Sequence, residues 1–384
     1  MNLRRIGAVA SKEWREVTRD RLFLLLAFLM PSLWMVVFGY GLVLDVEQIP
    51  FAVLDRDQSP MSRDYLYRFL ESRYFSFQGP LSHEAQSDEW LRTGRARAVI
   101  VIPEHFQERL RAGQAAHVQT LLDGTFPLRA DITKGYVIAV NSAFNTDLLV
   151  ESVARVRGLA RPDAQRLLQP IRLEVRYLYN EEVRSTWSTV PALVMLSLMV
   201  ASPLLTALGV VREKETGSIY NIYCATVSRL EFLAGKLLPY VGMSSINVVL
   251  LWLIAVWLFA VPFKGSLALF LVSALLFVLT STGIGLVVSL LVSTQQAALI
   301  ITVVVSTVPT ILFSGLMVPV SSLSPAAQAQ AHVFPGMYFT NIVRGTFLKN
   351  VGLAVLWADM LALLIYAGAL GLLGYRLFSK RPRQ

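Results

Sequence analysis

Four consecutive charged residues interrupt a strongly apolar part of the chain. The run 212–215, with the sequence REKE, follows an apolar stretch over 190–211 and precedes another over 237–263. Such charges are costly in hydrocarbon, so we expect the chain to leave the membrane here and to re-enter it near Lys236. The alternation of charged and apolar residues predicts a short amphipathic helix on the membrane face over 213–223. A plain connection between two spans is the alternative.

No catalytic motif accompanies this charged run. The phosphate-binding loop of an ATPase needs G-x-x-x-x-G-K-[ST], and the nearest fragment, 234–237, lacks the first glycine and the final hydroxyl. The motifs H-E-x-x-H and G-x-S-x-G and paired zinc cysteines are absent as well. His83, His105 and His117 lack the spacing and the carboxylate partners of a metal site. We therefore expect no catalytic residue, no bound cofactor and no metal in this chain.

Asp359 is nearly alone as an acid within the apolar stretches. Acids inside a membrane are functional candidates, although an interfacial position beside Trp357 is an equal alternative here. A proton-driven antiporter would bury several carboxylates in its spans. The energy for any transport is therefore expected to come from another subunit.

The composition indicates a membrane protein. The 384 residues are 54% hydrophobic and 16% charged, whereas a soluble domain has ~25% charged residues. The net charge of +9 fits basic residues held near anionic lipid, and nucleic-acid-binding motifs are absent. The single cysteine, Cys224, allows no disulfide within the chain.

The segment 1–21 predicts an amphipathic helix lying on the membrane surface. Apolar residues recur there at helical spacing among basic ones, and Trp14 is suited to anchor the helix at the interface. The basic residues favour a cytosolic position. A cleaved signal peptide is excluded, because the apolar run 22–44 is longer than a signal core and is not followed by a small-residue cleavage site.

Six apolar stretches are long enough to cross a membrane at ~20 residues per crossing. The first covers 22–44, and the other five lie in the region 188–378. We expect these five at 187–211, 237–263, 267–292, 297–318 and 351–378. The basic tail 379–384 then returns to the cytosol, which agrees with six crossings and with both termini being cytosolic.

Residues 45–187 are more polar and predict a separate domain outside the cytosol. The expected elements are strands at 49–55, 74–78, 96–103 and 118–123, helices at 61–71, 84–93 and 104–112, a long helix over 126–159 and a returning strand over 173–178. Helices that alternate with strands indicate an α/β fold. The predicted fold class is an α-helical polytopic membrane protein, with six transmembrane helices and an α/β extracytoplasmic domain between the first and second spans.

The segment 320–350 is too long for a turn and too mixed in composition for a span. Its prolines and glycines predict one or two short helices that dip into the outer leaflet. Backbone that is not one continuous helix is tolerated at that depth only where it is buried in protein or faces water. A loop lying on the surface is the alternative.

Two separated motifs resemble those of the ABC-2 type transporter permeases. The pattern R-E-x-E-x-G at 212–217, continued by SRLEF at 228–232 and Gly235-Lys236, is similar to the intracellular loop of that family. The family's usual Thr-Pro or Ser-Pro pair is missing, because 225–227 reads Ala-Thr-Val. The sequences FSGLMVP at 313–319 and 334–345 resemble the family's outer segment between the fifth and sixth spans.

The resemblance implies roles for three groups of residues. In the family the loop carries a coupling helix that docks on an ATPase, and the N-terminal helix packs beside it. The coupling residues would be Arg212, Glu213, Lys214, Glu215, Gly217, Arg229 and Glu231. The N-terminal helix would contribute Glu13, Trp14 and Arg19, and the outer re-entrant segment Gly315, Pro319, Pro335, Arg344 and Gly345.

The resemblance also implies a function. Such a chain would be the permease subunit of an ATP-driven exporter of amphipathic or drug-like compounds in a bacterial inner membrane. Its partners would be ABC ATPase subunits that bind ATP and Mg, a second copy or a similar permease, membrane lipid and a periplasmic adaptor protein. The residues that bind substrate are not predicted. The alternative is a membrane receptor or scaffold that displays 46–187 without transporting anything.

Overall fold

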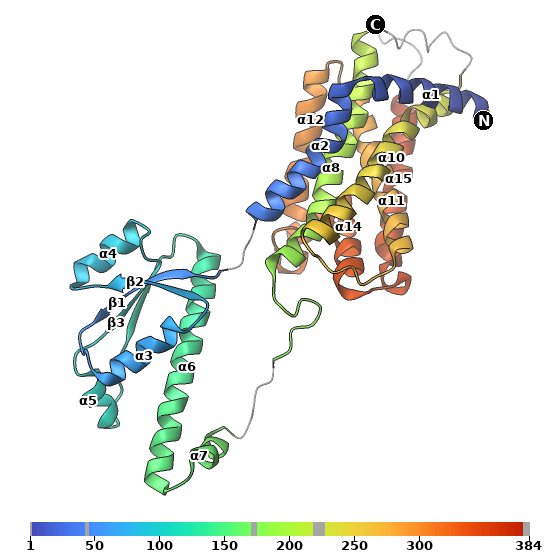
Figure 1. Cartoon of the computed structure of the whole chain (residues 1–384). Coiled ribbons are helices and arrows are strands. Elements are labelled where there is room, and N and C mark those ends of the chain that lie inside the picture. Colours follow the sequence, from blue (N-terminus) through green and yellow to red (C-terminus); the bar gives the residue numbers. More distant parts are fainter. Residues whose placement is uncertain (1, 43–45, 170–174, 218–226, 379–384) are drawn as a thin grey trace. The chain divides into compact units, whose positions relative to one another are not determined.

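The computed structural model describes residues 2–42, 46–169, 175–217 and 227–378. The chain forms two compact units, one made of 1–44 and 176–384 and the other of 45–175. Most of the chain is helical (Figure 1).

Among the described residues, the first unit contains six helices that are long and apolar enough to cross a membrane, as predicted. They are α2 (Arg21–Gly41), α8 (Ser185–Glu215), α10 (Arg229–Leu253) with its π-helical extension η1 (Ile254–Leu258), α11 (Leu267–Leu291), α12 (Gln295–Phe313) and α15 (Leu353–Leu377). The expected sixfold pattern of membrane helices is therefore confirmed.

Helix α8 forms the centre of this bundle. All but two of its side chains from Thr189 to Val211 are buried, and it packs against α2, α10, α11, α12 and α14. At Gly285 it approaches α11 closely enough for backbone contact, since a Cβ there would lie 2.2 Å from the carbonyl oxygen of Pro203. Small residues allow such close approach between membrane helices.

Helix α1 (Leu3–Arg19) lies across one end of the bundle and packs on α10 (Figure 1). The helix forms as predicted and buries Ile6 and Val17 of its apolar face, but its buried face also includes an acid. Glu13 is buried beside Val17, whereas Leu3 is 78% exposed and Trp14 is 40% exposed. The reason is that α1 packs against other helices, which offer a charged partner to Glu13.

The segment 320–350 folds into short helices within the bundle. These are η2 (Val320–Ser322), α13 (Pro325–Ala331), α14 (Pro335–Arg344) and the π-helix η3 (Gly345–Lys349). Phe339 of α14 stacks on Phe277 of α11 at 4.2 Å, and the Tyr366 hydroxyl donates to the His332 carbonyl at 2.8 Å. Since Tyr366 lies about 20 Å from the start of α15, the turn before α14 reaches well into the bundle. The segment is therefore not a surface loop.

The second unit is built on a four-stranded sheet in the order β2-β1-β3-β4. Strand β1 (Ile49–Asp55) runs parallel to β2 (Phe75–Pro80) and β3 (Ala98–Ile102), while β4 (Gln119–Leu122) is antiparallel to β3. The helices are α3 (Pro60–Leu70), α4 (Glu84–Arg92), α5 (Phe106–Arg111), α6 (Pro127–Arg157) and α7 (Arg161–Leu168). One sheet face packs on α3, α5 and α6, and the other packs on α4.

The end of this unit differs from the prediction. The unit ends at Val175 and α8 begins at Ser185, so the expected boundary at 187 lies inside α8. The strand expected over 173–178 is wrong for 175–178, which pair with no strand; 173 and 174 lie outside the described residues. Val175 and Tyr177 are exposed, and an alternating pattern without a face to bury gives no strand.

Candidate functional site: a charged junction of three helices

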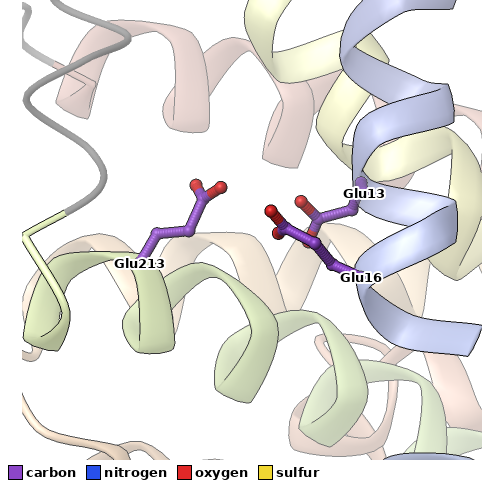
Figure 2. A group of neighbouring side chains, drawn as sticks. All are labelled: Glu13, Glu16 and Glu213. Atoms are coloured by element: carbon purple, nitrogen blue, oxygen red, sulfur yellow. The ribbon is translucent and has the colours of Figure 1, made fainter. Parts of the chain in front are cut away.

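A buried lysine lies where α1, α8 and α10 meet. Lys236 of α10 is 1% exposed, and its Nζ lies 2.6 Å from Oε2 of Glu13 and 2.8 Å from Oε2 of Glu213. Figure 2 shows the carboxyl groups of Glu13 and Glu16 on α1 and Glu213 on α8 directed toward one another. One ammonium group thus joins the N-terminal helix to two membrane helices.

Two further side chains complete what we call the charged junction, namely Lys12, Glu13, Glu213, Lys236 and Tyr240. Lys12 Nζ lies 2.9 Å from Glu213 Oε1, and the Tyr240 hydroxyl donates to Glu13 Oε1. Burial raises the pKa of the Glu13 carboxyl, and the Lys236 ammonium offsets part of that rise. Buried charges are tolerated only when paired and hydrogen-bonded, so the junction fixes these three helices in one arrangement.

The carboxylates of the junction invite comparison with a metal site. Oxygen atoms of Glu13, Glu16 and Glu213 lie within 4.8 Å of one another. However, the ammonium groups of Lys12 and Lys236 already provide positive charge to two of these acids. The arrangement is that of an ion-pair network, and the absence of a metal site stays a prediction. In the second unit His83, His105 and His117 are all exposed.

The remaining residues of the charged run reach three other helices. Arg212 pairs with Asp20, the N-cap of α2, at 2.6 Å. Lys214 donates to carbonyl groups at the end of α11, and Glu215 accepts from the backbone N–H of Gln295 at the start of α12 at 2.7 Å. Asp20 is also the C-cap of α1. The last turn of α8 is therefore bonded to the ends of α1 and α11 and to the starts of α2 and α12.

These positions correct part of the sequence interpretation. Residues 213–215 are the last turn of α8 and do not begin a separate surface helix, because each finds a partner on a neighbouring helix. Gly217 follows that turn with a φ of 73°, a left-handed conformation that suits glycine at a helix end. The rest of the expected coupling helix, 218–226, lies outside the described residues.

The other flank of that segment is also fixed to α1. Ser228 and Glu231 form a capping box at the start of α10. Glu231 also accepts from the backbone N–H of Asn2 at 2.6 Å and pairs with Arg5 at 3.9 Å. Arg229 is exposed. Both flanks of 218–226 are thus held by the same N-terminal helix.

Comparison with known proteins agrees with this arrangement. Residues 21–376 match the family model described as ABC-2 family transporter protein. The chain belongs to the ABC-2 transporter family. It is 28% identical over 371 residues to the Escherichia coli K12 protein named probable multidrug ABC transporter permease YbhS, covering 96% of this chain and 94% of that one. For the permease YbhR of the same organism the identity is 26% over 377 residues, covering 98% and 99%.

A more distant relative comes from another bacterium. The linearmycin resistance permease protein LnrN of Bacillus subtilis is 23% identical over 309 residues, covering 77% of this chain and 79% of that one. With six membrane helices and matches along nearly its whole length, this chain is a multi-pass ABC transporter permease.

The N-terminal helix of this permease contributes its three predicted residues in different ways. Glu13 enters the junction, Trp14 lies over Gly242 of α10, and Arg19 stays at the surface of the hollow beside Glu213. Lys236 and Tyr240 were not predicted as partners of Glu13. Lys236 could have been found, because a lysine within an apolar run requires a partner.

The predicted outer residues of the permease lie at the other end of the bundle. Gly315 has a φ of 79°, and Nη1 of Arg344 lies 3.8 Å from the position of a Cβ there. Arg344 also donates to the Leu316 carbonyl at 3.3 Å, so the structure brings these two residues together. Pro319 precedes η2, Pro335 begins α14 and Gly345 begins η3.

Proposed function

We propose that this permease is the membrane-spanning subunit of an ATP-driven exporter, and that it docks a separate ATPase through 212–231. The observation that carries the proposal is the bridge of Lys236 between Glu13 and Glu213. It joins the helices on both sides of 218–226 to α1, so force applied to that segment would move α1, α8 and α10 together. Nucleotide binding could then shift the bundle between two states that contact the ATPase differently.

The charge distribution supports an orientation. Basic residues gather on α1, the last turn of α8, the first part of α10 and the last turn of α15, namely Lys12, Arg15, Arg19, Arg212, Lys214, Arg229, Lys236 and Arg376. Basic residues in short loops favour the cytosolic side. We therefore propose cytosolic termini, an inner-membrane location and an extracytoplasmic position for 45–175.

The missing phosphate-binding motif supports an external energy source. ABC-2 permeases generally work with ABC ATPase subunits and often dimerise, so two ATPase subunits with ATP and Mg and a second copy or similar permease are the proposed partners. A periplasmic adaptor that contacts 45–175 would complete the path. The names of YbhS and YbhR support drug-like or amphipathic cargo.

The test replaces 218–226 by a Gly–Ser linker of equal length in the affinity-tagged full chain. This change leaves the charged junction intact. We expect wild-type protein purified in mild detergent to retain a P-loop ATPase, and the linker variant to lose it. A Gly–Ser replacement of the exposed Gln114 and Ala115 in the second unit is the control and should retain the ATPase. A stable wild-type chain that retains no nucleotidase would refute the proposal and favour the receptor alternative.

A further inference from the structure

Asp359 is an acid within a membrane helix, and no cationic side chain among the described residues pairs with it. It lies about 9 Å from the start of α15 and is half-buried. Asn341 of α14 donates an amide hydrogen bond to it at 3.4 Å, and among the described residues it forms no ion pair. A carboxylate at such a place is costly unless a partner compensates its charge. A positively charged ligand is one such partner.

Aromatic side chains continue the surface on which Asp359 lies. Tyr366 follows it by two turns on the same face of α15, and Tyr338 precedes Asn341 by one turn on α14. The rings of Tyr338 and Tyr366 are 6.1 Å apart, so the two helices place a carboxylate at one end of a shared row and two phenol rings at the other.

One backbone carbonyl holds both tyrosines in place. Both hydroxyl groups donate to the carbonyl of His332, at 3.0 Å from Tyr338 and 2.8 Å from Tyr366. The ring of His332 meets Tyr338 edge to face at 6.3 Å. Because their hydroxyl groups are occupied, the tyrosines offer ring surface to a ligand.

This row is open to its surroundings. Asn341 is exposed, and Asp359, Tyr338 and Tyr366 are partly exposed. Helix α15 also exposes large apolar side chains in the same part of the sequence, including Trp357, Leu364 and Ile365. Such a surface is typical of a helix that faces lipid, from which an amphiphile could reach the row directly.

We propose that Asp359, Tyr338 and Tyr366 form a binding site for the positively charged head of an amphiphile. The carboxylate would compensate the charge, while the phenol rings would contact the cation and its apolar neighbour through cation–π and van der Waals interactions. The inference rests on the proposed transport function, because it names a class of cargo for it. The same chemistry is offered by a membrane lipid with an ammonium headgroup and by a free cationic amphiphile.

The test measures binding of the cationic dye rhodamine 6G to the purified full chain in dodecyl maltoside by fluorescence anisotropy. We expect Asp359→Asn to weaken binding about tenfold and Tyr366→Leu to weaken it severalfold. Glu181→Gln, which removes an exposed acid from the same unit, should leave binding unchanged. The uncharged dye Nile red should bind wild type and Asp359→Asn alike.

Competition separates the two sources of the ligand. Displacement of the dye by phosphatidylethanolamine but not by phosphatidylglycerol would support a lipid headgroup, and displacement by neither would support a cationic cargo. Equal rhodamine 6G affinity of wild type and Asp359→Asn, with both folded by size exclusion, would overturn the proposal. The measurement needs neither ATP nor a partner, so failure to retain an ATPase would not alter its outcome.

Discussion

Two acids on membrane helices of this permease have opposite surroundings. Glu213 is buried at the end of α8 with the ammonium groups of Lys236 and Lys12 at 2.8 Å and 2.9 Å. Asp359 of α15 is half-buried, and the one side chain among the described residues that hydrogen-bonds to it is the neutral amide of Asn341. A carboxylate with cations on two sides fixes neighbouring helices, whereas the charge of a carboxylate with a neutral partner stays available to a cationic ligand. The difference separates a structural role at one end of the bundle from a binding role toward the other.

The largest expected effect comes from removing the shared cation. Lys236→Met leaves Glu13 and Glu213 buried without their common partner, and breaking a buried pair in this way costs about 3–5 kcal/mol. We expect a correspondingly large fall in the thermal unfolding temperature in detergent. Asp359→Asn is the contrasting variant and should change that temperature little, because it leaves no charge unpaired. An equal fall in unfolding temperature for the two variants would refute the distinction between a structural acid at Glu213 and a binding acid at Asp359.

Removing all three charges should reverse much of that loss. In the triple variant Lys236→Met, Glu13→Gln, Glu213→Gln no buried ion is left without a partner. Replacing a whole buried ion pair by neutral groups is often nearly neutral in free energy of unfolding. We expect thermal unfolding of the triple variant to lie closer to wild type than to Lys236→Met. A triple variant less stable than Lys236→Met would show that the side-chain shapes, rather than the charges, hold the junction.

The sequence was sufficient for some parts of this picture and not for others. Hydropathy located the six spans, because each is a long apolar run whose helical fold follows from the membrane itself. It could not place 213–215, since whether a charged turn lies at the surface or within a junction depends on partners far away in the chain. Glu13 and Lys236 are separated by 223 positions, and only folding brings them together.

A third, smaller effect tests the neutral member of the junction. Tyr240→Phe removes the hydroxyl that donates to the buried Glu13 and packs against Gly209, where a Cβ would lie 1.7 Å from that hydroxyl. Loss of such a bond costs about 1–3 kcal/mol. Tyr366→Phe removes the hydroxyl of a partly exposed tyrosine and should cost less. Chemical denaturation would measure the loss in free energy of unfolding for both variants. A larger loss for Tyr366→Phe than for Tyr240→Phe would contradict the expectation.

The smallest expected effect concerns a partly exposed acid of the second unit. Asp147 on α6 pairs with Arg68 of α3 at 2.8 Å and with Arg161 of α7 at 3.2 Å, and Arg68 and Arg161 lower the pKa of its carboxyl. A carboxyl whose folded pKa is lowered stabilises the fold above its ordinary pKa, and this contribution is lost as the pH falls through the folded value.

Because these pairs lie at the surface and are only partly buried, Asp147→Asn should cost only about 0–1 kcal/mol near neutral pH. Hydrogen exchange of α7 in the full chain should be faster in the variant near neutral pH. The difference from wild type should shrink once the pH is below the folded pKa, where both side chains are uncharged. A difference that persisted there would mean that the carboxyl acts through its shape. The two cationic partners of Asp147 would then not stabilise the unit through charge, unlike the partners proposed to hold Glu213.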